Sequence, residues 1–152
     1  MKTKPIQIVV CGTDTDVGKT IISALLVQGL HATYWKPIQT GLEEGSDIKT
    51  ICNLLKLPND RWIPEVYKFQ APVSPHWAAE KEHELINPSK LTIPLSDKNP
   101  LIIETAGGVL VPLNRDWLQI EQIQRWQLPV LVVARSGLGT LNHSLLTLDC
   151  LL

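Results

Sequence analysis

The stretch Gly12-Thr13-Asp14-Thr15-Asp16-Val17-Gly18-Lys19-Thr20 determines the fold that this sequence predicts. It follows an apolar run, residues 7–11, whose β-branched side chains are typical of a strand buried on both faces. It precedes a run that ends near Gly29 and carries apolar residues at helical spacing: Ile21, Leu25 and Leu26. The glycine-bounded loop therefore joins a strand to a helix, where backbone N–H groups and the helix dipole favour an anion.

Two residues at the end of this loop suit a phosphate site. Lys19 supplies a positive charge for β- and γ-phosphates, and the Thr20 hydroxyl is a hard oxygen ligand for Mg²⁺. The common phosphate-loop pattern has four residues between its first glycine and Gly-Lys-Ser/Thr. This chain has five residues between Gly12 and Gly18. The alternative is a turn that only links strand to helix, but Gly-Lys-Thr and both flanks favour phosphate binding.

Composition and charge limit the partners of the chain. Its 152 residues are an ordinary size for one domain, and 14 Lys plus Arg against 15 Asp plus Glu give a net charge of −1. This balance offers no attraction to nucleic acid or to an anionic membrane. No segment approaches the length of a membrane span, and the apolar run after residues 1–5 is too short for a signal peptide. We therefore predict a cytoplasmic protein with no nucleic-acid or membrane partner.

Short apolar runs alternate with amphipathic ones along the rest of the chain. They predict strands at 32–36, 101–103 and 130–134 and helices at 47–55 and 116–126. Prolines interrupt residues 56–99, where we expect one extended piece near 66–69 and one helix near 77–84. The alternation predicts a three-layer α/β fold of the P-loop NTPase type. Its mostly parallel sheet has helices on both faces and binds ligands at the carboxyl ends of the strands.

The C-terminal segment carries a stripe of leucines at helical spacing: Leu141, Leu145, Leu148 and Leu152. The stripe ends without a terminal glycine or a polar finish. We expect either an incomplete chain that lacks its last strands or a helix buried against a partner subunit. Residues 1–152 then form a single P-loop nucleotide-binding domain, incomplete at its C-terminus.

Three charged residues stand where predicted strands end or helices begin. Lys36 closes the second strand, Asp47 opens a helix, and Glu104 follows a buried strand. The topology brings all three towards the phosphate loop. Ser46 or Asp47 is also a favoured helix cap, and Lys36 alone could be a solvated lysine at a sheet edge. A carboxylate directly behind a buried strand is where nucleotide hydrolases hold Mg²⁺, which favours a metal role for Glu104.

At this point the sequence resembles the dethiobiotin synthetase family over nearly its whole length. The matching motifs occur in family order: Gly12-Thr13-Asp14-Thr15-x-Val17-Gly18-Lys19-Thr20, Lys36-Pro37-Ile38-x-Thr40-Gly41, Ser46-Asp47, Pro72-x-Ser74-Pro75-His76, Glu104-x-Ala106-Gly107-Gly108, and Leu128-Pro129-Val130 with Leu141-Asn142-His143. The resemblance implies an ATP- and Mg²⁺-dependent enzyme of biotin synthesis. Its substrate, 7,8-diaminopelargonic acid, takes up CO₂, supplied as such or as bicarbonate, to form a carbamate. ATP phosphorylates the carbamate, and the neighbouring amine closes the ureido ring.

The resemblance also assigns expected roles to residues. The expected catalytic residues are Lys36 and Lys19. The expected nucleotide site comprises Asp16, Val17, Gly18, Lys19, Thr20, Ile21, Asp47, Glu104, Thr105, Ala106 and Gly107. The expected Mg²⁺ ligands are Thr20, Asp47 and Glu104. The expected substrate contacts are Thr15, Thr40, Gly139, Thr140 and Asn142, of which the last three would serve the partner's site in a homodimer.

Some residues have an alternative structural role, and others depart from the family pattern. For Asn142 a helical hydrogen bond is an equal alternative, and His76 is interpreted as a capping or packing histidine. Asp16 places a negative charge near phosphates, so we expect it to face the diamine or a metal-bound water. Thr105 stands where the family usually has glycine, which predicts strain if that backbone needs φ above zero. The adenine-recognition segment of the family lies beyond Leu152, which leaves the base preference open.

Two other functions compete with the synthetase. The first is a P-loop switch or partitioning ATPase, whose relatives usually carry a lysine at the place of Asp14. The second is an inactive phosphate-binding fragment of the synthetase. Residues 36–41 and 74–76 favour the enzyme, because a bare nucleotide-binding domain does not need them.

Overall fold

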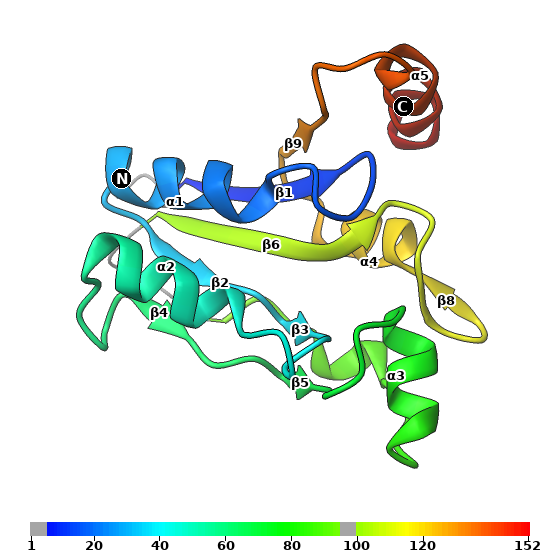
Figure 1. Cartoon of the computed structure of the whole chain (residues 1–152), viewed down its shortest axis with the longest axis horizontal. Coiled ribbons are helices and arrows are strands. Elements are labelled where there is room, and N and C mark those ends of the chain that lie inside the picture. The colour runs from blue at the N-terminus through cyan, green and yellow to red at the C-terminus, as the bar shows by residue number, and fades with distance from the viewer. Residues whose placement is uncertain (1–5, 95–99) are drawn as a thin grey trace.

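The computed structural model describes residues 6–94 and 100–152. The N-terminal residues 1–5, which entered the signal-peptide argument, lie outside this part. The main sheet has five strands in the order β4-β2-β6-β1-β9, and every pairing is parallel (Figure 1). These strands are β1 (Gln7–Gly12), β2 (Thr33–Trp35), β4 (Trp62–Ile63), β6 (Leu101–Gly108) and β9 (Val130–Val133). The chain therefore has the expected α/β architecture, with a mostly parallel central sheet.

Two small sheets lie beside the main one. One is parallel and pairs β3 (Ile38–Gln39) with β5 (Tyr67–Lys68), and the other is an antiparallel pair, β7 (Pro112–Asn114) and β8 (Trp117–Leu118). The helices are α1 (Lys19–Gly29), α2 (Asp47–Leu55), α3 (Pro75–Lys81), the 3₁₀ turn η1 (Pro88–Lys90), α4 (Gln119–Trp126) and α5 (Thr140–Leu151).

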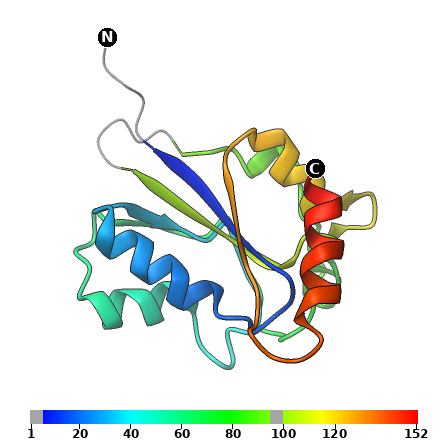
Figure 2. The same ribbon diagram turned by 90° about the horizontal axis from the view of Figure 1, so that it is seen from above.

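Helices cover both faces of the main sheet. Figure 2 shows α1 and α2 on one side of the strands and α4 and α5 on the other. Alternate residues of the central strands supply the two cores. Val10 and Ile102 pack with α1 and α2, whereas Val9 and Ile103 pack on the opposite side with α3 and α4. Because the strands are parallel, their carboxyl ends meet at one edge, where Gly12, Lys36 and the end of β6 lie.

Several predicted elements are confirmed, and the helix at 47–55 has both predicted bounds. The strands at 7–11, 32–36, 101–103 and 130–134 also form. β6 runs on to Gly108, so Glu104 lies inside this strand rather than after it. The helix predicted at 116–126 begins only at Gln119, because residues 112–118 form the β7–β8 hairpin.

The middle of the chain contains the other differences. The extended piece near 66–69 is β5, which is shorter than predicted. The helix predicted at 77–84 covers Pro75–Lys81, since a proline suits its first turn and His83 adopts a left-handed φ of 55° just beyond its end. The short strands β3 and β4 carried too few residues to be recognised in the sequence.

Small residues form most of the buried face of α1. Ile21 and Leu25 are 54% and 64% exposed, and the residues that face the sheet are Ser23, Ala24 and Val27. Small side chains allow α1 to pack closely on β1 and β6. Of the three apolar residues noted in the sequence, Leu26 packs against the core, whereas Ile21 and Leu25 are exposed.

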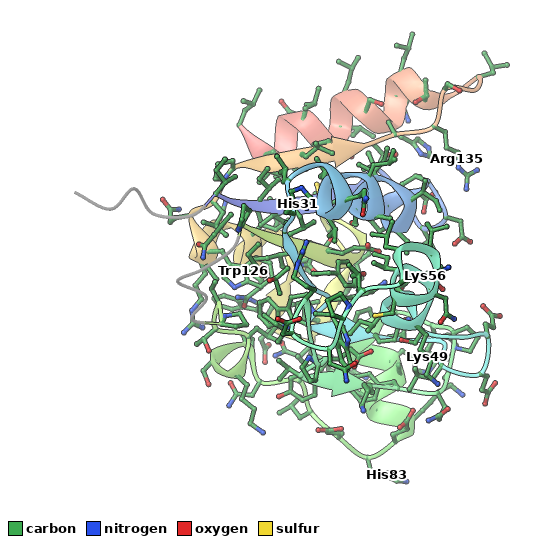
Figure 3. All side chains as sticks on the ribbon, turned by 90° about the vertical axis from the view of Figure 1, so that its left-hand side faces the viewer. His31, Lys49, Lys56, His83, Trp126 and Arg135 are labelled. Atoms are coloured by element: carbon green, nitrogen blue, oxygen red, sulfur yellow. The ribbon has the colours of Figure 1, made fainter. Side chains whose placement is uncertain are left out.

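The leucine stripe of α5 lies on the outside of the described structure. Leu141, Leu145, Leu148 and Leu152 are exposed, while Thr147, Cys150 and Leu151 face the rest of the chain. Figure 3 shows side chains that project from the outer face of α5. The predicted cover, a partner subunit or further strands, remains a prediction. Among the residues that the structure describes, none of the helices combines the length and hydropathy needed to cross a bilayer.

The two faces of the fold predict a contrast between two leucine substitutions. Leu101 is fully buried in the core, so Leu101→Ala should lower the free energy of unfolding by about 2 to 5 kcal/mol. Leu25→Ala, on the exposed face of α1, should change it by less than about 0.5 kcal/mol. Urea unfolding followed by circular dichroism measures both. Equal losses would show that Leu25 is buried in the folded chain and would contradict this packing of α1.

Candidate active site at the carboxyl edge of the sheet

The loop between β1 and α1 has the tight backbone of a phosphate cradle. Asp16 and Gly18 adopt left-handed φ angles of 55° and 101°, and Gly18 caps α1. A Cβ atom on Gly12 would lie 2.8 Å from both the Asp14 carbonyl oxygen and Val17 Cγ2, and 3.0 Å from Lys19 Nζ. Only glycine therefore lets the loop close on the end of β1.

The side chain of Lys19 lies within this loop. Its ammonium group donates a hydrogen bond to the Asp14 carbonyl oxygen at 2.8 Å, and the residue is buried. Burial and the nearby Lys36 charge lower the pKa of Lys19. An anion in the loop would counter both effects, so the loop favours a bound phosphate.

Three oxygen-bearing side chains from separate elements meet beside the loop. The Thr20 hydroxyl, on α1, lies 2.8 Å from Asp47 Oδ1 at the start of α2 and 2.9 Å from Glu104 Oε1 on β6. A hydroxyl has one proton, so it cannot donate to both carboxylates at the same time. A cation near this point would satisfy all three oxygens.

The ammonium group of Lys36 lies between the same two carboxylates. It forms ion pairs with Asp47 Oδ2 and with Glu104 Oε1, the latter at 3.4 Å. Burial lowers the pKa of Lys36, but Glu104 and Asp47 outweigh burial and raise it above its ordinary value. Burial raises the pKa of Asp47, but the Lys36 charge and the hydrogen bonds from Lys36, Thr20 and Gln39 together outweigh burial and hold the pKa below its ordinary value. Lys36 and Asp47 are therefore both charged at neutral pH.

Two further polar residues of this site were missed in the sequence. Tyr34 donates from its hydroxyl to Glu104 Oε2 at 3.0 Å, and burial with the Glu104 charge raises its pKa well above its ordinary value. Gln39 is buried and accepts a hydrogen bond from the Asp47 backbone N–H at 3.1 Å. The only sequence signal for Tyr34 is its place two residues before Lys36, which puts both side chains on one face of an extended segment.

Neither of the two residues considered as caps of α2, Ser46 and Asp47, caps the helix through its side chain. Ser46 holds the N-cap position without a side-chain cap bond, and its hydroxyl instead donates to Glu65 Oε1 at 3.3 Å. The carboxylate of Asp47 points to Thr20 and Lys36. Gln39 takes the place of the local cap.

Most of these residues line one cleft of about 810 Å³, although Tyr34 does not. The candidate residues that line it are Thr15, Asp16, Gly18, Lys19, Thr20, Ile21, Lys36, Thr40, Asp47, Glu104, Ala106 and Gly107. Val17 and Thr105 do not line it. Thr105 lies in β6 without a left-handed φ, so the strain considered for it does not arise; Gly107 has the positive φ, 66°.

Gly139, Thr140 and Asn142 lie apart from the cleft, at the start of α5. Thr140 donates from its hydroxyl to the Arg135 carbonyl oxygen at 2.5 Å. Arg135 projects from the segment before α5 (Figure 3) and donates to the Thr15 carbonyl oxygen at 3.4 Å. Hence this segment touches the phosphate loop without entering the cleft.

The donor set beside the loop suits Mg²⁺. Within residues 6–94 and 100–152 there is no cluster of three or more His, Cys, Asp or Glu side chains that would hold a metal. Thr20, Asp47 and Glu104 instead provide two carboxylates and one hydroxyl. Mg²⁺ commonly binds through one or two carboxylates and completes its shell with water and substrate phosphates. A phosphate in the adjacent loop would supply those missing oxygens.

The hydrogen bond between Tyr34 and Glu104 should make a measurable contribution to the free energy of unfolding. Tyr34→Phe removes a hydrogen bond to a fully buried carboxylate and should lower the free energy of unfolding by about 1.5 to 3 kcal/mol. Tyr67→Phe is the control, because the buried Tyr67 hydroxyl accepts a hydrogen bond from a neutral group, the Asn87 backbone N–H. It should cost about 0.5 to 1.5 kcal/mol. If urea unfolding gave Tyr34→Phe no larger a loss than Tyr67→Phe, Glu104 would not depend on this hydroxyl.

Comparison with known proteins gives the family. A family profile described as "AAA domain" matches residues 6–151. A protein of Rhodopseudomonas palustris (strain BisA53) is 48% identical over 145 residues, which cover 95% of this chain and 68% of the relative. Proteins of Bradyrhizobium diazoefficiens and Paramagnetospirillum magneticum are 50% and 51% identical, and the matches cover 69% and 68% of their lengths. All three are named ATP-dependent dethiobiotin synthetase BioD, and the chain belongs to this family of ATP-dependent synthetases.

Proposed function

We propose that this chain uses Mg²⁺ and ATP to carboxylate 7,8-diaminopelargonic acid and close its ring to dethiobiotin. The observation that carries the proposal is the meeting of Lys36, Thr20, Asp47 and Glu104 beside the phosphate loop, in one cleft. The names of the relatives supply ATP and the product, dethiobiotin, and the family resemblance of the sequence motifs supplies the diamine.

The proposed reaction has three steps. One amine of the diamine adds to CO₂ and loses a proton, which gives a carbamate. A carbamate oxygen attacks the γ-phosphorus of ATP, and ADP leaves. The second amine then attacks the carbonyl carbon of the mixed anhydride, loses a proton and expels inorganic phosphate, which closes the ureido ring.

The second step brings two anions together, so its main requirement is to neutralise their repulsion. Lys36 is buried and charged, and we place it beside the carbamate and the phosphoryl group in transfer. Lys19 and the loop N–H groups hold the phosphates. Mg²⁺ held by Thr20, Asp47 and Glu104 would neutralise phosphate charge. Lys36 now pairs with those carboxylates, and a cation beside them would free its charge for the substrate.

The remaining polar residues of the cleft suit contacts with the diamine. Thr15 and Thr40 line it and carry hydroxyls. Asp16 is exposed at its rim in a left-handed conformation that Asp tolerates. We assign Asp16 to the diamine or to a metal-bound water, because an unpaired carboxylate there would repel ATP.

The experiment that tests the function is phosphate release from Mg-ATP, with and without bicarbonate and the diamine. Release that requires every component supports the synthetase. Release that is indifferent to the diamine identifies the switch ATPase instead, and no release identifies the inactive fragment. One of the longer relatives, assayed in parallel, provides the positive control.

The same assay measures the role of Lys36. Lys36→Met should lower kcat for diamine-dependent phosphate release by at least about 100-fold, because the variant loses a charge aimed at the transferring group. Lys49→Met is the matched control, since it removes the same charge from an exposed position on α2 (Figure 3). Urea unfolding of both variants identifies the folded fraction. If the folded Lys36→Met protein had the same kcat as Lys49→Met, the proposed role of Lys36 beside the transferring phosphoryl group would be wrong.

We also propose a cytoplasmic homodimer in which Gly139, Thr140 and Asn142 reach the partner's site. Two observations support it: these residues lie outside the cleft of their own chain, and the adjoining α5 exposes its leucines. The cytoplasm is proposed because it supplies ATP.

Light scattering coupled to size exclusion tests the dimer. The chain should elute at twice its own mass, and Leu145→Asp should shift it to a monomer, because a charge would have to be buried in the interface. Leu54→Asp, a control at an exposed leucine of α2, should remain dimeric. A monomeric parent chain, or equal behaviour of the two variants, would contradict the proposal.

A further inference from the structure

Gln39 occupies the junction between the metal side and the substrate side of the cleft. It ends β3, the short strand that follows Lys36 and Pro37 and pairs with β5. The residue is only 5% exposed, although it lines the cleft. A buried amide needs partners for both its oxygen and its nitrogen.

Both ends of this amide have partners on different elements. Oε1 accepts from the Asp47 backbone N–H at 3.1 Å, and Nε2 donates to the Thr40 carbonyl oxygen at 2.7 Å. The two partners determine which end is oxygen, because a backbone N–H only donates and a carbonyl only accepts. Gln39 therefore spans the start of α2 and the segment that begins at Thr40.

The contact with Asp47 replaces a local helix cap. The first N–H groups of a helix have no partner within the helix, and the Ser46 side chain does not supply one to α2. Gln39 instead binds the N–H of the residue whose carboxylate contacts Thr20 and Lys36. Fixing this backbone group limits where the Asp47 carboxylate can point.

The contact with Thr40 fixes the other side of the cleft. Its carbonyl is held by Gln39, and the next N–H, of Gly41, donates to the Ala71 carbonyl oxygen at 3.0 Å. Gly41 has a positive φ of 73°, and a Cβ there would lie 3.3 Å from Pro72 Cβ. The backbone around Thr40 is thus anchored on both sides of the peptide bond that follows it.

We infer that Gln39 is a positioning residue, whose one amide holds the Asp47 carboxylate and the Thr40 segment at a fixed separation. It touches neither metal nor reacting atoms. It couples the geometry of the metal ligands to that of the substrate contacts, and so sets both sides of the cleft at once. The substrate half of this inference rests on the proposed function, whereas the Asp47 half does not.

Two variants separate the two parts of the inference: the contact with Asp47, called the Asp47 arm, and the contact with Thr40, called the Thr40 arm. Gln39→Met keeps the length of the side chain and removes both hydrogen bonds. Gln39→Glu keeps an acceptor for the Asp47 N–H and loses the donor to Thr40. Ile51→Val is the control for a general loss of stability, because Ile51 is a buried core residue of α2 that does not line the cleft.

The first readout is amide hydrogen exchange of Asp47 without ligands, measured by NMR. Exchange should speed up roughly 3- to 10-fold in Gln39→Met, from the loss of one hydrogen bond, and stay near the parent rate in Gln39→Glu and Ile51→Val. This readout needs no catalysis, so it decides the Asp47 arm even if the proposed function fails. An unchanged rate in Gln39→Met would overturn that arm.

The second readout is steady-state phosphate release. Gln39→Met should raise both the KM for the diamine and the Mg²⁺ concentration for half-maximal rate roughly 3- to 10-fold, with the KM for ATP unchanged at saturating Mg²⁺. Gln39→Glu should raise the KM for the diamine and decides the Thr40 arm if Gln39→Met does not fold. If Ile51→Val changed the KM for the diamine and the Mg²⁺ requirement equally, or if Gln39→Met changed kcat alone, Gln39 would have only a structural role. A parent chain without diamine-dependent release refutes the proposed function and, with it, the Thr40 arm.

Discussion

The site depends on one buried charge cluster, in which the Lys36 ammonium lies between the carboxylates of Asp47 and Glu104. Removing one partner from such a cluster leaves an uncompensated charge and costs about 3 to 5 kcal/mol. The fold therefore has to bring β2, α2 and β6 to the same place. The Thr20 hydroxyl and the Tyr34 hydroxyl complete the partners of Glu104 from two further positions.

Parallel topology explains how residues far apart in sequence reach this cluster. β1, β2 and β6 pair in parallel, so the loop after Gly12, Lys36 and Glu104 all lie towards one edge of the sheet. The α1 helix begins directly at Lys19, which places Thr20 in its first turn and facing the carboxylates. The oxygens of Thr20, Asp47 and Glu104 thereby lie beside the loop that we propose for the phosphates, which is the arrangement that phosphoryl transfer needs.

The sequence predicted the parts of this arrangement that local pattern controls. The loop with its flanking strand and helix, the helix at 47–55, and the convergence of Lys36, Asp47 and Glu104 follow from periodicity, turn chemistry and parallel topology. Parts that depend on distant partners were missed. Tyr34 and Gln39 become part of the site only through hydrogen bonds to Glu104 and Asp47, and no local sequence pattern predicts these hydrogen bonds. The exposure of Ile21 and Leu25 also could not be read from their spacing, because the close approach of α1 to the sheet buries the small residues Ser23 and Ala24 instead.

In the proposed site, a cation at the Thr20 hydroxyl and the Asp47 and Glu104 carboxylates shares the cleft with Lys36. A crystal structure with Mn²⁺ in place of Mg²⁺ and a non-hydrolysable ATP analogue tests this most directly, through anomalous scattering from the metal. We expect one strong peak at coordination distance from Thr20 and within reach of both carboxylates, with the Lys36 ammonium near the γ-phosphate. A peak elsewhere, or a Glu104 carboxylate turned away from the phosphate loop, would contradict it.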